Sequence, residues 1–127
     1  MFICIDNKAN LIATYDYGPS NIYQVANNIY VDVNQYIYIY IPGSGKQYYS
    51  DGRVYKYGDG VTQYYQNGKF YKIGDYVFEY LQNGCLYRIG NSTFDYLSNG
   101  KYFKIGDSTF DYYSSGMPFK IGNTYIR

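Results

Sequence analysis

The sequence contains no histidine and no tryptophan, and it has two cysteines and a single glutamate among its 127 residues. The absence of histidine excludes a Ser-His-Asp triad and a histidine-ligated metal site, and two cysteines cannot complete a four-thiolate zinc site. Alanine and glutamate, which favour helices, are scarce. We therefore expect no enzyme, no cofactor and no long helix.

Charge and long apolar runs are also scarce. The formal net charge is +1, so no strong field favours nucleic acid or an anionic membrane surface. No apolar run approaches the ~20 residues of a membrane helix, and we expect no membrane insertion. The segment MFICIDNKAN lacks the basic region of a signal peptide, and its apolar run ends at Asp6. Cys4 and Cys85 are then expected to be free thiols, which predicts a cytoplasmic protein.

Tyrosine and glycine are abundant instead, with 22 and 14 residues respectively. Tyrosine, like the Ile, Val, Phe and Thr that accompany it, favours half-buried β-strands. The glycines recur every sixteen residues in two interleaved series, and so regular a period predicts a repeat architecture. The two series are Gly52, Gly68, Gly84, Gly100, Gly116 and Gly58, Gly74, Gly90, Gly106, Gly122.

Each sixteen-residue unit contains two turn signals. Asn99-Gly100 and its equivalents are typical of a type I′ hairpin turn, in which both central residues take a positive φ. Gly106-Asp107 and its equivalents suit a type II′ turn, which has glycine first. Two-residue loops at both places predict strands of alternating length in an antiparallel meander of about fourteen to sixteen strands.

We predict an all-β fold in which tandem 16-residue β-hairpin repeats form one continuous, curled antiparallel meander over a single domain, 1-127. Units in 1-52 are degenerate and units in 53-127 are regular. Degenerate terminal units suit a capping role. The aromatic face of the meander must be buried, and three arrangements achieve this: a flattened barrel, a sandwich, or an open single sheet packed on a second copy.

Strict alternation across the Asn99-Gly100 turn predicts which side chains share a face. One face would hold an aromatic core that includes Phe94, Phe103 and Ile105. The other would hold a polar ladder flanked by exposed aromatic rings. The candidate interaction surface on that face comprises Tyr38, Tyr49, Tyr65, Phe70, Tyr102 and Tyr113.

The polar ladder places an acceptor opposite a cation in each unit, as for Asp95 opposite Lys104. Asp95 and Asp111 would stand roughly 9–10 Å apart, two strands away from each other, which is a spacing that a glycosidase could use. Each carboxylate faces its own lysine, however, and the pattern recurs in every unit, whereas a catalytic pair would be unique. We interpret the ladder as structural, with each pair contributing about a few tenths of a kcal/mol.

The stretch FDYLSNGKYFKIG resembles the tyrosine-aspartate repeats of RHS-type proteins. The equivalent stretch QYYQNGKFYKIG is similar to MORN-variant repeats and to the aromatic hairpins of choline-binding modules. This resemblance covers Gln47 to Arg127 and implies tandem hairpins, and no function is transferred with it. The chain has no tryptophan from which to build a choline cage.

These features predict a non-catalytic scaffold that acts through protein contact, including self-association. The alternative is a glycan-binding module whose exposed tyrosines stack on sugar rings. A glycan binder should repeat the same binding residues in each unit. The predicted outer positions vary instead, which favours the scaffold; they are Tyr49, Tyr65, Leu81, Leu97 and Tyr113.

The chain ends supply a further reason to expect self-association. The first strand, Met1 to Ile5, is apolar and uncharged. An edge strand of this kind exposes unpaired backbone groups without a protecting charge. Either it pairs with the last strand, Asn123 to Arg127, and closes the sheet, or it pairs with another chain. We expect pairing across a subunit boundary, because a closed barrel of this many strands would be hollow.

Overall fold

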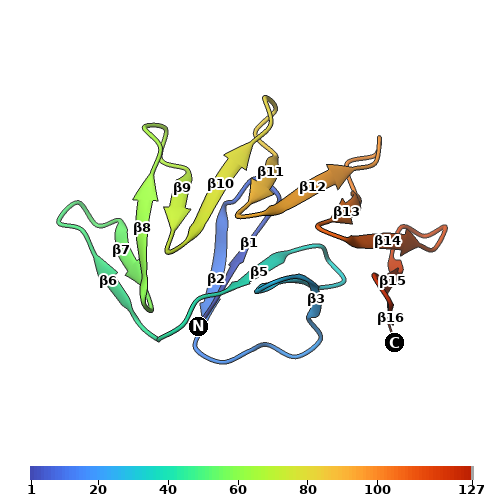
Figure 1. Ribbon diagram of the computed structural model, residues 1–127, viewed down its shortest axis with the longest axis horizontal. Coiled ribbons are helices and arrows are strands. Elements are labelled where there is room, and N and C mark those ends of the chain that lie inside the picture. The colour runs from blue at the N-terminus through green and yellow to red at the C-terminus, as the bar shows by residue number, and fades with distance from the viewer. Residues whose placement is uncertain (127) are drawn as a thin grey trace.

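The computed structural model describes residues 1–126, which form sixteen antiparallel β-strands in two sheets. Five strands form an N-terminal sheet in the order β2-β1-β5-β4-β3, and eleven form a repeat sheet in chain order from β6 to β16 (Figure 1). The described residues include no helix long and apolar enough to cross a membrane. The predicted all-β architecture of tandem hairpins is confirmed, and the sheets do not close into a barrel.

The strands are short throughout. Those of the N-terminal sheet are β1 (Phe2–Ile5), β2 (Leu11–Tyr15), β3 (Tyr23–Ala26), β4 (Ile29–Val31) and β5 (Ile37–Tyr40). Those of the repeat sheet are β6 (Lys46–Tyr48), β7 (Val54–Tyr57), β8 (Gly60–Tyr64), β9 (Phe70–Ile73), β10 (Tyr76–Tyr80), β11 (Leu86–Ile89), β12 (Ser92–Tyr96), β13 (Tyr102–Ile105), β14 (Ser108–Tyr112), β15 (Pro118–Ile121) and β16 (Thr124–Tyr125).

The Asn-Gly turns of the repeat sheet differ from the predicted type I′ geometry. The Gly100 N–H donates to the carbonyl of Leu97 at 2.9 Å, and the Leu97 N–H donates to the carbonyl of Lys101 at 2.7 Å, which closes a three-residue loop. Gly100 has a φ of +89°, whereas Asn99 is not in the positive-φ region. This is a type I turn followed by a glycine in the left-handed region, the commonest three-residue hairpin loop.

A β-bulge follows each of these turns and overturns the predicted faces. Asp95 pairs with Lys104 as expected, but Tyr96 pairs with Tyr102, so that Phe103 is the extra residue. As a result Tyr102 is buried in the core and Phe103 is 48% exposed. The same shift occurs in the other hairpins of this kind, and it points two consecutive side chains of each short strand outward.

The Gly-Asp turns behave as predicted. Ile105 pairs with Ser108 across a two-residue loop, and Gly106 has a φ of +58° while Asp107 does not take a positive φ. This matches the type II′ geometry that glycine in the first position favours. The regular hairpin pattern also starts at β6, because Gln47 pairs with Lys56 and the same bulge follows.

In the N-terminal sheet the three inner strands, β1, β5 and β4, pair without a bulge, whereas the pairing of each edge strand, β2 and β3, contains one register shift. Along β5, Ile37 and Ile39 face the repeat sheet and are fully buried, while Tyr40 points to the opposite side and is half-buried. Its strand order also departs from a meander, because β1 pairs with both β2 and β5. The prediction that Met1 to Ile5 form an unprotected edge is therefore wrong: β1 lies inside the sheet, and β2 and β3 are its edges.

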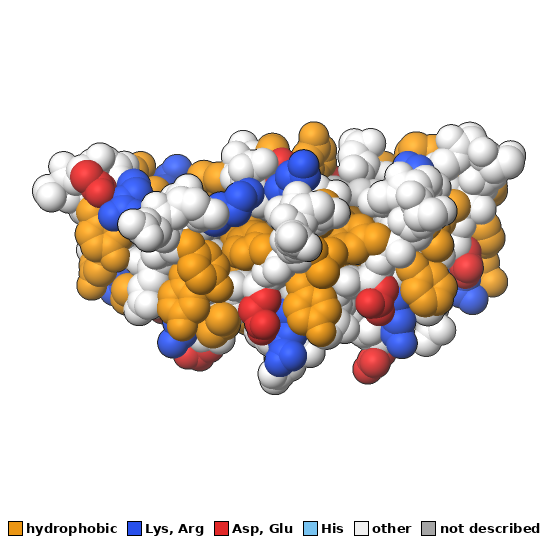
Figure 2. Space-filling model, turned by 90° about the horizontal axis from the view of Figure 1, so that it is seen from above, with side chains coloured by type: hydrophobic (Ala, Val, Ile, Leu, Met, Phe, Trp, Pro, Cys, Tyr) orange, Lys and Arg blue, Asp and Glu red, His pale blue; other side chains and the backbone are white. Residues whose placement is uncertain are grey.

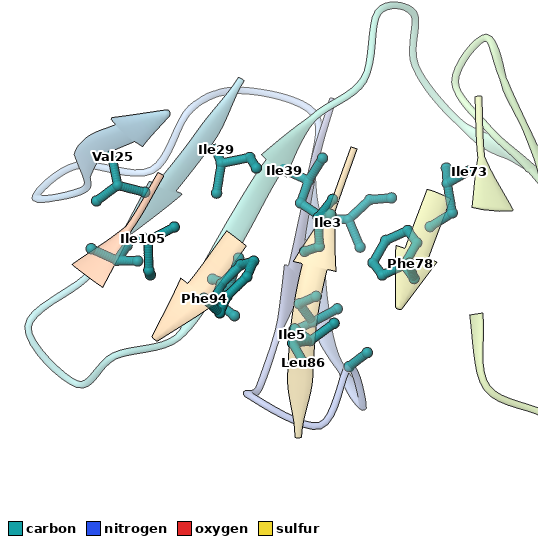
Figure 3. Close-up of a cluster of buried hydrophobic side chains, with 14 of the residues drawn as sticks. Ile3, Ile5, Val25, Ile29, Ile39, Ile73, Phe78, Leu86, Phe94 and Ile105 are labelled. Carbon is teal, nitrogen blue, oxygen red and sulfur yellow. The ribbon is translucent and has the colours of Figure 1, made fainter. Parts of the chain in front are cut away.

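The core lies between the two sheets. Figure 3 shows Ile3, Ile29 and Ile39 of the N-terminal sheet pointing toward Phe78 and Phe94 of the repeat sheet. Of the three predicted arrangements, the sandwich is the one adopted. The degenerate N-terminal units supply its second layer and so cover the aromatic face that a second copy was expected to cover.

Polar contacts also join the layers. The Leu86 N–H donates to the carbonyl of Asn7 at 2.7 Å, and the Ser108 hydroxyl donates to the carbonyl of Val25 at 2.8 Å. The Asn28 amide donates to the Tyr76 hydroxyl at 2.7 Å. These bonds are spread from β10 to β14, so the N-terminal sheet is fixed across the middle of the repeat sheet.

Candidate interaction surface

The bulges create a row of aromatic side chains on the outer face of the repeat sheet. Each short strand contributes the residue in its second position, and every unit supplies an aromatic residue there. Four of the five are between 38% and 48% exposed, and the last is half-buried. We refer to this row as the outer ladder: Tyr55, Tyr71, Tyr87, Phe103 and Phe119.

A second aromatic ring packs against three rings of the outer ladder, Tyr55, Tyr71 and Phe119. Tyr49 lies against Tyr55 with ring centroids 5.1 Å apart, and Tyr65 lies against Tyr71 at the same distance. In both pairs the planes meet at a steep angle, which is the edge-to-face arrangement that aromatic pairs favour. The Tyr49 and Tyr65 hydroxyls donate to backbone carbonyls of the next long strand, at 2.9 and 3.1 Å. The supporting rings are therefore fixed in place.

The polar ladder runs beside the aromatic row. The register places Glu79 opposite Arg88 and Asp95 opposite Lys104, as predicted. Among the described residues, Glu79 and Arg88 form the one ion pair of this ladder, at 3.4 Å between Nε and Oε2. Figure 2 shows hydrophobic side chains alternating with Asp or Glu and Lys or Arg side chains along one long side of the molecule. The outer face thus offers a ring, an acceptor or carboxylate, and a cation in each unit.

The six residues of the predicted interaction surface lie in three different places. Tyr49, Tyr65 and Tyr113 lie on the outer face, at the ends of the hairpins. Phe70 and Tyr102 were expected there too, but the bulge turns them into the core, where they are 5% and 1% exposed. The remaining residue, Tyr38, belongs to the N-terminal sheet and is treated separately below.

Tyr38 is 7% exposed on the far face of the N-terminal sheet, where Tyr15 packs beside it. Its hydroxyl donates to Oδ2 of Asp32 at 2.7 Å. Burial, together with this acceptor, raises the pKa of Tyr38 well above its usual value. Cys4 on the neighbouring strand is buried as predicted, and burial raises the pKa of its thiol. Tyr38 is therefore a packing residue of the N-terminal sheet.

Many of the remaining tyrosines have a structural role that recurs in each unit. The last tyrosine of each long strand donates its hydroxyl to a carbonyl ten residues earlier, as from Tyr96 to Leu86 at 2.7 Å and from Tyr80 to Phe70 at 2.7 Å. Burial raises the pKa of both tyrosines. These hydroxyls satisfy backbone carbonyls at the start of the bulged strands, which explains why tyrosine recurs where phenylalanine would pack equally well.

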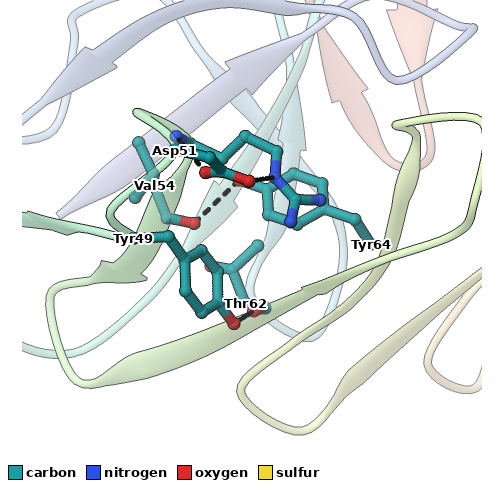
Figure 4. A network of polar contacts seen from close by, with 6 residues as sticks. Tyr49, Asp51, Val54, Thr62 and Tyr64 are labelled. Atoms are coloured by element: carbon teal, nitrogen blue, oxygen red, sulfur yellow. Dashed lines mark hydrogen bonds and ion pairs between the residues drawn. The ribbon is translucent and has the colours of Figure 1, made fainter.

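The first regular hairpin carries a denser polar network (Figure 4). The Arg53 guanidinium pairs with Asp51 at 2.9 Å and stacks over the ring of Tyr64, 4.8 Å from its centroid. Hydrogen bonds from the Arg53 backbone and side chain hold the pKa of Asp51 below its usual value. The Tyr64 hydroxyl donates to the carbonyl of Val54 at 2.8 Å.

This network borders a groove of about 440 Å³ between the hairpin tips and the β1–β2 loop. The two cations at the groove already have partners, since Arg53 pairs with Asp51 and Lys69 donates to the carbonyl of Lys8 at 2.7 Å. Among the described residues there is no cluster of three or more Cys, Asp or Glu side chains that could hold a metal ion. The outer ladder is therefore the surface with the most regular chemistry.

Comparison with models of known protein families, with curated protein sequences and with solved structures finds no match. The resemblance to tyrosine-aspartate and other aromatic hairpin repeats stays a prediction.

Proposed function

We propose that this protein is a non-catalytic binding scaffold that acts by contact through the outer face of its repeat sheet. The observation that carries the proposal is the outer ladder, in which an aromatic ring recurs in every unit beside an acceptor and a cation. Rigid aromatic side chains supply large contact area at little cost in side-chain entropy. A surface that repeats one contact suits a partner that is itself extended or repetitive.

Variation among the predicted outer positions argued against a glycan-binding module, but the outer ladder does not vary in this way. Leu81 and Leu97 do not interrupt the outer ladder, because Tyr87 and Phe103 supply the aromatic ring in those two units. The position that repeats is the bulged one. A repeated binding residue, expected of a module that reads a polymer, is therefore available in each unit.

An array experiment tests this proposal. The protein and a triple variant, Tyr71→Ser with Tyr87→Ser and Phe103→Ser, are each applied to arrays of glycans and of peptides. Because these side chains are outside the core, we expect the triple variant to keep its fold and its circular dichroism spectrum. Ligands held by the protein should be lost by the variant and kept by Tyr17→Ala, which removes an 88% exposed ring from the loop between β2 and β3.

Ligands that bind the protein and the triple variant equally, or that are chemically converted, contradict the proposal. Equal binding would assign recognition to another surface.

Self-association is a second candidate function, and a specific observation favours it. The edge strand β2, LIATY, carries no charge, and Leu11 and Ile12 are 43% and 50% exposed. Such an edge pairs readily with another strand.

An antiparallel pair of β2 strands from two copies, centred on Ala13, would place Leu11 opposite Tyr15. Light scattering should then detect a dimer that Ile12→Lys converts to monomer, and a monomeric parent protein at high concentration would contradict it.

A further inference from the structure

We propose that the outer ladder binds an extended, β(1→4)-linked neutral polysaccharide whose sugar rings lie over Tyr71, Tyr87 and Phe103 and their equivalents. This inference rests on the proposed function, because it names the partner of the same surface. It follows from the spacing of the rings, from the chemistry beside them and from the balance of charge.

The spacing of the ladder selects among extended polymers. Equivalent rings on successive short strands are two strands apart, which is about 9.5 Å. An extended β(1→4)-linked polysaccharide presents the same face once per disaccharide, and the length of that repeat is close to this spacing. An extended peptide instead presents the same face every two residues, or about 6.7 Å. A β-strand ligand would therefore place its side chains out of step with the ladder.

A polyproline II peptide is the closest competitor. It rises about 3.1 Å per residue with three residues per turn, so prolines at every third position also match the ladder. Such a peptide offers carbonyl acceptors but few donors. It would cover the carboxylates of Glu79 and Asp95 without supplying the donors that covered acceptors need.

Sugar hydroxyls fit the polar ladder better, because each hydroxyl can donate and accept. Arg88 and Lys104 can donate to ring hydroxyls while Glu79 and Asp95 accept from them. Gln63, which faces Lys72, can do both. Each unit thus places a donor and an acceptor next to one apolar ring, as needed to recognise a sugar by its face and its hydroxyls together.

The charge balance points to a neutral polymer. Three of the five cations of the polar ladder face a carboxylate, and the other two face glutamine. A densely anionic polysaccharide would meet a carboxylate in each of the last three units. A neutral polymer meets no such repulsion.

A length series of oligosaccharides tests the inference by titration calorimetry. The probes are β(1→4)-linked glucose and N-acetylglucosamine oligomers of two to eight sugars, with a soluble β(1→4)-linked glucomannan as the polymer. We expect affinity to rise with length up to the number of units spanned, and the disaccharide to bind too weakly to detect. Removing one ring, as in Tyr87→Ala, should weaken binding of the polymer roughly three- to tenfold, from the strength of one aromatic contact.

The controls separate this inference from the proposed function. Tyr17→Ala should leave the affinity unchanged, and Tyr87→Phe should retain most of it because the ring face remains. No binding across the series, or binding that Tyr87→Ala does not weaken, overturns the polysaccharide assignment. In that case a peptide with proline at every third residue is titrated next. Its binding, if lost in Tyr87→Ala, would identify the partner as protein and leave the contact function in place.

Discussion

In the centre of the N-terminal sheet, β1, β5 and β4 pair without a bulge and their side chains alternate between two faces, whereas each short strand of the repeat sheet turns two consecutive side chains outward. The first sheet devotes one face to the shared core and the other to a layer that includes Phe2, Tyr30 and Tyr40. The second keeps its core face and gains an additional outward side chain in each unit. The difference shows how a bulge adds a surface residue without removing a core residue.

The two sheets also differ in how their strands are connected. The repeat sheet contains only neighbouring hairpins, so its pairing is local. The N-terminal sheet inserts β1 between β2 and β5, which requires contact between segments more than thirty residues apart. Local pairings form more readily than distant ones. The departure from the repeat is what allows the first forty residues to turn over and cover the other sheet.

The largest expected effect tests whether the two regions form one cooperative structure. Phe94→Ala in the repeat sheet should cost about 3–5 kcal/mol, and Ile39→Ala in the N-terminal sheet about 2–5 kcal/mol, since both side chains are fully buried. Because they share a core, each should lower the midpoint of a single urea transition. The transition is followed by circular dichroism and by tyrosine fluorescence.

Two separated transitions, with Ile39→Ala affecting only one, would show that the sheets unfold independently. Ile12→Ala is the matched control, because Ile12 is 50% exposed at the edge of the N-terminal sheet. It should change the midpoint little.

The next effect tests the bulge through two adjacent aromatic residues. Tyr102→Ala should cost about 3–5 kcal/mol, because the side chain is 1% exposed and packs near Phe94 and Phe110. Phe103→Ala should cost less than about 1 kcal/mol, because its ring is on the outer face. Denaturant unfolding of both variants measures the difference. Equal costs, or the reverse order, would mean that the strands alternate strictly and that the outer ladder does not exist.

Much of the fold follows from the sequence, because the turn dipeptides and the sixteen-residue period specify hairpins directly. The pairing of Asp95 with Lys104 and the number of strands were predicted in this way. The bulge was missed because Asn99-Gly100 suits both a two-residue and a three-residue loop. The choice between them decides whether Tyr102 or Phe103 faces the core, and since both are large and aromatic, hydrophobicity could not decide it.

Neither the packing of the two sheets nor the outer ladder could be predicted from the sixteen-residue repeat. Pairing of β1 with β5 involves strands that are both apolar on two faces, so no alternation pattern specified their order. The outer ladder was hidden by the same bulge. Phe103 was assigned to the core, and Phe70 and Tyr102 to the surface, by a shift of one residue. A shift of one residue exchanges the two faces of a strand.

A smaller effect tests the junction between the two regions through two glycines. Gly58 has a φ of +55°, and a Cβ there would collide with the backbone carbonyl of Pro42, where the chain passes from one sheet to the other. Gly68 has a φ of +90° in an open hairpin tip, with no atom near the position of a Cβ. Gly68→Ala should cost about 1–2 kcal/mol from backbone strain alone. Gly58→Ala should cost measurably more, because the collision adds to the strain.

The comparison is made from the melting temperatures of the two alanine variants. If Gly58→Ala is the milder change, then the passage from Pro42 to β6 is not held tightly against the repeat sheet.

The smallest effect concerns the hydroxyl of Tyr112, which joins the two regions. It donates to the carbonyl of Tyr102 at 2.5 Å and accepts from the Gln35 amide of the N-terminal sheet at 2.8 Å. Tyr112→Phe should cost about 1 kcal/mol at neutral pH, the usual net worth of a hydrogen bond.

Burial raises the pKa of Tyr112 to about 12 despite these two bonds. Because the folded protein holds this proton more tightly than the unfolded chain, the contribution is complete below about pH 10 and is lost as the pH rises toward 12. Unfolding measured from pH 7 to 12 should therefore show that Tyr112→Phe is the less stable protein at pH 7 and that the gap narrows above pH 10. A gap that widens there would mean that the Tyr112 hydroxyl is ionised more readily in the folded protein, and so is not held between the two sheets.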